Sequence, residues 1–179
     1  MISVHENLSM IYRRRSIRSY TEEPVSEEVI LEIVKAGMAA PSAINVKPWH
    51  ITVIANAELR GKIADTSERH RGCCRYAPYV LLVSGDSRRY TGNYAQVVAD
   101  FMPQDCSAMV QNMLLAAAAF DLGSLWMGVF PYETEINTLR ELLGLPQELI
   151  PFALVAIGHK GEEKEARTQY EEAQVAWLR

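Results

Sequence analysis

Short apolar runs rich in β-branched residues most constrain what this chain can fold into. They read as strands over residues 49–55, 79–85, 124–130 and 152–158. A doubly wound parallel sheet is not implied. The pattern instead predicts an α+β fold, with helices around a small mixed sheet.

Hydrophobic spacing and end signals predict the helices. They are expected over about 5–14, 26–40, 57–70, 103–120 and 133–144. Ser26 is a good N-cap, and Pro103 suits a first helical turn. Gly123 fits the position just past a helix end. In the first helix, Leu8 and Ile11 are expected on the inner face.

Composition narrows the classes of function. The 179 residues show no linker or repeat, which predicts one domain over 1–179. A net charge of −4 argues against nucleic-acid or anionic-membrane partners. The odd number of cysteines, 3, with Cys73 and Cys74 adjacent, favours free thiols in a reducing compartment. With no secretory signal or spanning segment recognised, we expect a cytoplasmic protein.

The usual catalytic signatures are missing from the sequence. It holds no G-x-S-x-G elbow, phosphate-binding P-loop, H-E-x-x-H or G-x-G-x-x-G pattern. The cysteines and histidines lack metal-ligand spacing, so no metal site is expected. His50 and His70 have no evident partner in sequence, and no catalytic side chain is predicted.

A cationic cluster stands out in this acidic chain. In "IYRRRSIRSY" (11–20), Arg14, Ser16 and Arg18 alternate, so an extended backbone would place them on one face and Arg15 on the other. Guanidinium groups bind phosphate through paired hydrogen bonds, and a hydroxyl adds a neutral donor. The pattern fits a phosphate site, and it also fits a solvated charged helix end.

Two further stretches are candidate ligand contacts. "AAPSAINVKPWH" (39–50) is a loop of small residues between prolines, in which Asn45 can both donate and accept hydrogen bonds. The segment 122–130 places Gly123 and Gly128 around a Trp-Met pair. Each also has a plain structural interpretation, as a helix–strand connection and as a core strand.

Taken together and in order, these motifs resemble the FMN-dependent nitroreductase family. The matching blocks include R-R-S-x-R, A-P-S-x-x-N followed by P-W, "QDCSAMVQNMLLAAAAFDLGSLWMGVFP" and "LPQELIPFALVAIGHKGEEKEAR". The resemblance covers nearly the whole chain. It implies a mixed, largely antiparallel sheet flanked by helices and an intertwined homodimer, with residues from about 161 onward wrapping the partner.

The resemblance also implies which residues hold the cofactor FMN. Arg14, Arg15, Ser16 and Arg18 would hold its phosphate and ribityl chain. Arg167 would add a phosphate contact, with Lys164 as the competing assignment. The remaining implied contacts to the isoalloxazine ring are Pro41, Ser42, Ala43, Asn45, Met127, Gly128 and Val129. Arg13 falls outside the matched positions and is expected to face solvent.

The implied activity is NAD(P)H-dependent oxidoreduction in two alternating half-reactions. Hydride passes from NADH or NADPH to flavin N5 and then to a nitroaromatic, quinone or similar small acceptor. Two alternatives stay open on the sequence. One is another flavin reaction on the same fold, such as dehalogenation, azoline oxidation or flavin fragmentation. The other is a non-enzymatic protein that binds FMN or senses redox state.

Overall fold

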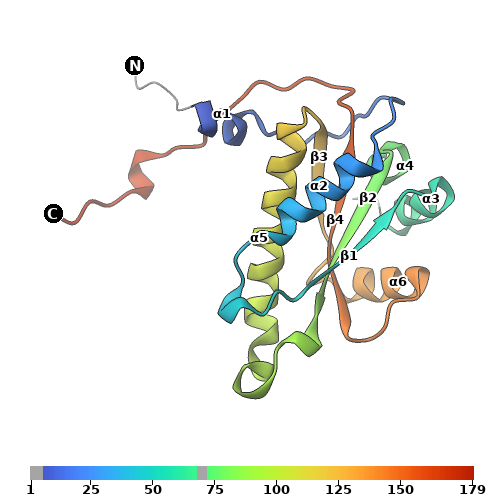
Figure 1. Cartoon of the computed structure of the whole chain (residues 1–179), viewed down its shortest axis with the longest axis vertical. Coiled ribbons are helices and arrows are strands. Elements are labelled where there is room, and N and C mark those ends of the chain that lie inside the picture. The colour runs from blue at the N-terminus through green and yellow to red at the C-terminus, as the bar shows by residue number, and fades with distance from the viewer. Residues whose placement is uncertain (1–5, 68–71) are drawn as a thin grey trace.

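A computed structural model describes residues 6–67 and 72–179 of the chain (Figure 1). The helices are α1 (Glu6–Arg13), α2 (Glu27–Met38), α3 (Ala57–Thr66), α4 (Cys73–Tyr76), α5 (Val98–Ala119) and α6 (Glu133–Leu143). The strands are β1 (Trp49–Ile54), β2 (Tyr79–Asp86), β3 (Gly123–Gly128) and β4 (Leu149–Gly158). Short 3-10 turns include η1 (Ala43–Asn45), η4 (Gly92–Val97) and η5 (Glu172–Gln174).

The strands form one 4-stranded sheet in the order β1-β2-β4-β3. Each neighbouring pair is antiparallel: Trp49 lies opposite Gly85, and Gly123 lies opposite Gly158. β1 and β3 are therefore the two edges of the sheet. The α+β class predicted from the sequence, with a largely antiparallel sheet flanked by helices, is confirmed.

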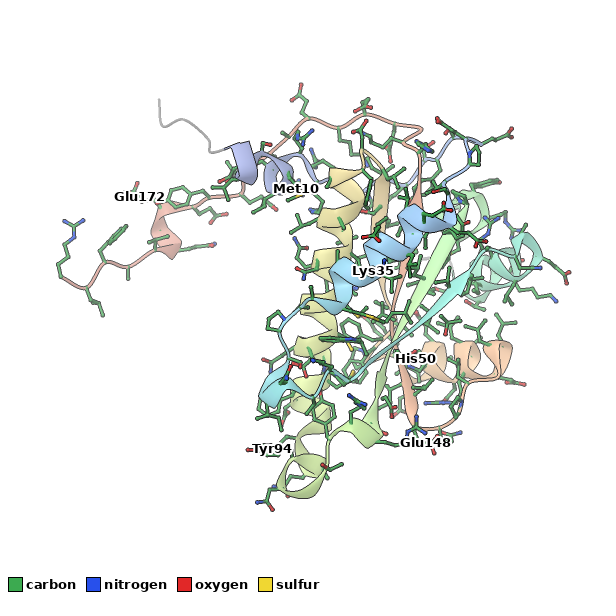
Figure 2. All side chains as sticks on the ribbon, viewed as in Figure 1. Met10, Lys35, His50, Tyr94, Glu148 and Glu172 are labelled. Carbon is green, nitrogen blue, oxygen red and sulfur yellow. The ribbon has the colours of Figure 1, made fainter. Side chains whose placement is uncertain are left out.

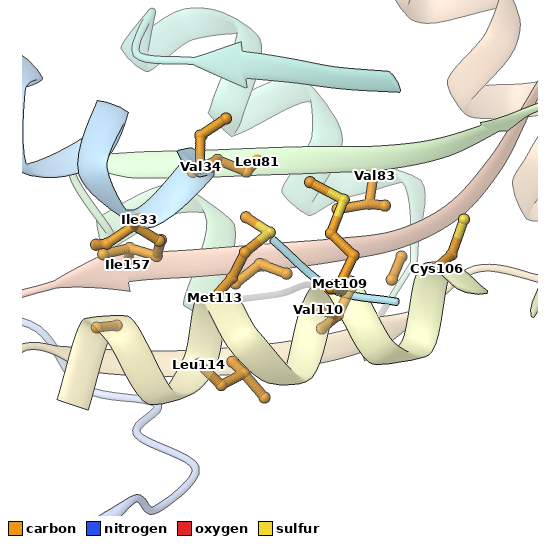
Figure 3. Packing of buried hydrophobic residues seen from close by; sticks show 14 of the residues in the cluster. Ile33, Val34, Leu81, Val83, Cys106, Met109, Val110, Met113, Leu114 and Ile157 are labelled. Atoms are coloured by element: carbon orange, nitrogen blue, oxygen red, sulfur yellow. The ribbon is translucent and has the colours of Figure 1, made fainter. Parts of the chain in front are cut away.

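Helices cover both faces of the sheet (Figure 1). α2 and α5 bury one face, where Ile33, Met109 and Met113 belong to one buried cluster with the strand residues Val83 and Ile157, shown in Figure 3. On the other face, Ile63 of α3 and Leu139 of α6 lie in a second buried cluster. Complete burial of such side chains is the main stabilising term of the fold.

The ends of the long helix differ from the sequence-based expectation. α5 begins at Val98, with Pro103 inside it, and not at Pro103. Met102, fully buried, packs over Gly85 and so fixes the turn before the proline despite the lost hydrogen bond. After the helix, Asp121 takes the left-handed conformation (φ 57°). Gly123 instead opens β3, where a Cβ would lie 2.7 Å from Ile17.

The first helix and the last residues project from the body of the molecule (Figure 1). Leu8 and Ile11 are 44% and 46% exposed, so their assignment to an inner face is wrong within a single chain. The expected helix start at residue 5 lies outside the described residues. Beyond Arg167 the tail leaves the body, as the position of Glu172 in Figure 2 shows, and Trp177 is 75% exposed. Among the described helices, none is long and apolar enough to cross a membrane.

Candidate functional site

The segment that carries the arginine cluster is extended and lies beside β3. The backbone N–H of Ile17 donates to the carbonyl oxygen of Ser124 at 3.0 Å, and Ser16 forms a parallel bridge to Ser124. Ile17 is buried, which fixes the alternation of this segment. The predicted grouping of Arg14 with Arg18, and of Arg15 on the opposite face, is nevertheless wrong: Arg14 and Arg15 line one hollow, and Arg18 lines another.

Arg14 lies at the centre of a group of cations. Burial, then the positive charges of Arg167 and Arg15, lower the pKa of the Arg14 guanidinium below its usual value. The tail supplies Arg167, whose backbone N–H donates to the carbonyl oxygen of Tyr12 at 3.1 Å. The Arg15 guanidinium donates to the carbonyl oxygen of Glu165. Two distant parts of the chain thus bring like charges together, and an anion at this place would relieve their repulsion.

The competing tail cation, Lys164, is already engaged. Its Nζ donates to the carbonyl oxygen of Ser16 at 2.7 Å and to Glu162 Oε1 at 3.1 Å. Lys164 therefore ties the tail to the arginine segment, and Arg167 is the tail residue that adds its charge to Arg14. Arg13 is exposed, as expected, but it also lines the hollow that Arg14 and Arg15 line.

Arg18 lies apart from Arg14, in a different hollow. This second hollow has a volume of about 330 Å³ and is lined by Arg18, Leu125, Trp126, Met127, Gly128 and Tyr132. A Cβ at Gly128 would meet no atom within 4 Å, so the backbone there faces open space. Glu162 holds this part of the segment, since its carboxylate accepts from the backbone N–H of Arg18 at 2.5 Å and of Ser19 at 3.3 Å.

The third predicted group, Pro41, Ser42, Ala43 and Asn45, is far from the arginine cluster. The Ala43 N–H donates to Asp105 near the start of α5, whereas Arg14 lines a hollow with Ala118 near its end. At 1.5 Å per residue, α5 rises about 20 Å between Asp105 and Ala118. Residues 41–45 also lead into β1, the sheet edge opposite β3. One chain therefore does not bring all the predicted contacts together.

Val129 and Met127 are buried behind Gly128, so their side chains belong to the core and only the backbone at Gly128 is open.

His50 is exposed on β1, and His70 lies outside the described residues. Within the described ranges, no group of acidic, histidine or cysteine side chains could hold a metal ion.

Sequence reasoning missed Glu162 and Asp105, which hold these segments in place, and it considered Lys164 only as a phosphate contact. Glu162 and Lys164 clamp the arginine segment, and the buried Asp105 accepts from the loop at Ala43. An acidic residue within the apolar helix run 103–120 was a usable signal for Asp105. No comparable signal marks Glu162, which stands in a uniformly charged stretch.

The fold is an α+β sheet with clustered arginines beside its edge strand and open backbone at the end of that strand, an arrangement that suits an anionic ligand. The chain belongs to the nitroreductase family, whose model matches residues 11–70 and 66–159. The family resemblance read from the sequence is confirmed.

Individual relatives agree with this assignment. A protein of Archaeoglobus fulgidus, described as a proposed NADH dehydrogenase/NAD(P)H nitroreductase, is 39% identical over 162 residues, 90% of each chain. The crystal structure of a protein of the same description from Parabacteroides distasonis superimposes with a TM-score of 0.87, at 28% identity, over 97% of this chain and 98% of that one. A proposed nitroreductase from Desulfovibrio desulfuricans, solved with FMN, has a TM-score of 0.80 at 32% identity, over 99% and 98%.

Proposed function

We propose that this protein is an FMN-dependent oxidoreductase that takes electrons from NADH or NADPH and passes them to nitroaromatic, quinone or similar small acceptors. The observation that carries the proposal is the position of Arg14, which lines one hollow with Arg15 and an adjoining one with Arg167. Clustered guanidinium groups suit a phosphate dianion, which fits the anionic end of FMN. The names of the family relatives support the redox activity.

The open end of β3 suits the ring of the cofactor. We assign the backbone of residues 127–129 to the ring, because Gly128 is open and the flanking side chains are turned into the core. Arg18 lines the same hollow, so we assign it to the ring end and not to the phosphate. A cation there would stabilise negative charge on a reduced ring. When bound, FMN supplies the hydride-accepting and hydride-donating chemistry.

A second copy of the chain would complete the site. Residues 41–45 lie about 20 Å along α5 from the arginine cluster, so we propose that they reach the ring held by a partner subunit. Leu8 and Ile11 of α1 and Trp177 of the tail are exposed. They support such a homodimer, because several large apolar side chains exposed on projecting segments indicate an interface.

We propose that the tail from about residue 161 onward docks on the partner, in the groove between α2 and the edge strand β1. Apolar side chains line that groove, among them Leu31, Met38 and Val53, which are exposed in one chain. Trp177 and Leu178 would fill it. Glu27 at the rim would then lie opposite the charge of Arg179.

A cytoplasmic location is a further proposal, supported by the free thiols of the described cysteines.

The deciding experiment is titration of the purified protein with FMN, followed by anaerobic addition of NADH or NADPH. We expect flavin absorption bands, a binding constant weakened at least about tenfold by Arg14→Ala and by Arg167→Ala, and no change for the control Lys62→Ala, an exposed cation on α3. Bleaching of the flavin band by NAD(P)H and turnover with an acceptor support the reductase. Tight binding without bleaching would support the non-enzymatic alternative, and failure to bind FMN would end the proposal.

A further inference from the structure

A buried carboxylate holds the loop that follows α2. Asp105 is only 5% exposed, and each of its oxygens accepts one hydrogen bond. Oδ1 accepts from the backbone N–H of Ala43 at 2.7 Å, and Oδ2 accepts from the hydroxyl of Tyr90 at 2.6 Å. Tyr90 is itself 3% exposed. Tyr90 thus orients the Asp105 side chain through Oδ2, and Asp105 bonds the loop to the core helix α5 through Oδ1.

The loop needs such support because three of its residues adopt backbone conformations of high energy. Ile44, Asn45 and Lys47 have φ values of 45°, 60° and 51°, in the left-handed region that residues other than glycine seldom adopt. Such conformations persist only where the surrounding structure holds them, and they concentrate at ligand sites. Within the loop, Ser42 Oγ accepts from the Lys47 N–H at 2.9 Å. That bond closes the loop on itself, whereas the bond to Asp105 ties it to the core.

We propose that Asp105, oriented by Tyr90, is a positioning residue that sets the shape of residues 42–47 for contact with the flavin ring. The inference rests on the proposed function in one respect, the assignment of this loop to the ring. Burial and the hydrogen bond to Asp105 both raise the pKa of Tyr90, so its hydroxyl keeps the proton that it donates.

The chemistry of Asp105 separates two substitutions. Asp105→Ala removes both acceptors and leaves the Ala43 N–H without its partner. Asp105→Asn can still present its carbonyl oxygen to Ala43, because the Tyr90 hydroxyl can rotate and accept from the new amide. The asparagine variant should therefore recover most of the loop order that the alanine variant loses. Asp100→Ala, an exposed position on the same helix, is the matched control.

The first test is amide hydrogen exchange over residues 41–48 in protein freed of FMN. We expect Asp105→Ala to speed exchange there at least about tenfold, with Asp105→Asn and the control close to wild type. Unchanged exchange in a folded Asp105→Ala protein overturns the inference. If the alanine variant does not fold, Tyr90→Phe decides: several-fold faster exchange in the same peptide supports the inference, and wild-type exchange overturns it. Tyr94→Phe, at an exposed tyrosine, is its control.

The second test uses protein reconstituted with FMN. Because the arginine cluster is untouched, Asp105→Ala should retain FMN within a few-fold of wild type, yet shift the flavin absorption bands and its midpoint potential. Asp105→Asn should restore both. An unshifted flavin spectrum and midpoint potential in Asp105→Ala would overturn the proposal that Asp105 positions the loop for contact with the flavin ring. Failure of the wild type to bind FMN would instead count against the proposed function, and the exchange result would still report on the clamp.

Discussion

Lys164 donates from Nζ to the carbonyl oxygen of Ser16 at 2.7 Å, which joins the start of the tail to the arginine segment. The bond is charge-assisted and partly buried, and the same ammonium contacts Glu162 at 3.1 Å. Because the cation cluster is made from both segments, this contact sets how Arg167 meets Arg14.

Lys164→Met should lower the free energy of unfolding by roughly 1–2 kcal/mol, the usual cost of losing a hydrogen bond to a charged group that is partly exposed. It should also weaken FMN binding several-fold, because the tail loses its tie. Urea denaturation and FMN titration measure the two effects. Lys62→Met, in an exposed ion pair on α3, is the control and should change neither. Full retention of FMN affinity would show that the tail is held without Lys164.

Glu162 should make stability depend on pH in the acid range. Hydrogen bonds from the Arg18 backbone and from Lys164 lower the pKa of its carboxyl below the usual 4.5. A lowered folded-state pKa means that the unfolded chain binds protons more readily, so the stabilisation is complete above pH 4.5 and is lost as pH falls through the folded value. Glu162→Gln should flatten this part of a curve of unfolding free energy against pH. A curve identical to wild type would contradict the prediction.

Gly128 and Gly123 should respond oppositely to valine, although both belong to β3. At Gly128 a Cβ meets no atom, so Gly128→Val should fold with wild-type thermal stability and lose most FMN affinity. At Gly123 a Cβ would lie 2.7 Å from Ile17, so Gly123→Val should lower the midpoint of thermal unfolding. Thermal melts and FMN titration of both variants check the pair. FMN binding by Gly128→Val at wild-type strength would contradict the assignment of the flavin ring to the hollow at Gly128.

The cysteines should be unreactive in the folded protein. Burial raises the pKa of the Cys73 thiol, and it raises the pKa of the Cys74 and Cys106 thiols to about 12. Thiolate is the reactive form, so thiol titration at pH 8 should be at least about a hundredfold slower in native than in denatured protein. Fast reaction of the native protein would indicate that this region opens readily.

Trp177→Glu should shift the proposed dimer toward monomer, because a charge cannot enter an apolar groove without a partner. Light scattering coupled to size-exclusion chromatography measures the mass at several concentrations. Glu172→Gln, on the same tail, should leave the mass unchanged. A Trp177→Glu protein that stays dimeric would place the interface elsewhere, for example on α1 alone.

Local patterns in the sequence predicted most of the secondary structure. Periodicity and end signals located each strand to within a few residues, and Ser26 caps α2 as expected, accepting from Val29. These features depend on contacts between residues close in sequence, which local patterns record. The ordered motifs likewise identified the nitroreductase family and the arginine segment.

Other features of the fold and the site depend on contacts between residues far apart in sequence. Helices stand between successive strands, yet the strands pair antiparallel; the family resemblance predicted this pairing, whereas the local strand and helix patterns did not, because pairing depends on partners far apart in sequence. The burial of Met102 extends α5 upstream of Pro103, so the helix begins at Val98. Arg18 lies near β3 and Ala43 precedes β1, so the two opposite edges of the sheet separate these residues. Asp105 took its role from Ala43 and Tyr90, residues on other segments. Long-range packing settles such contacts, and no local pattern carries them.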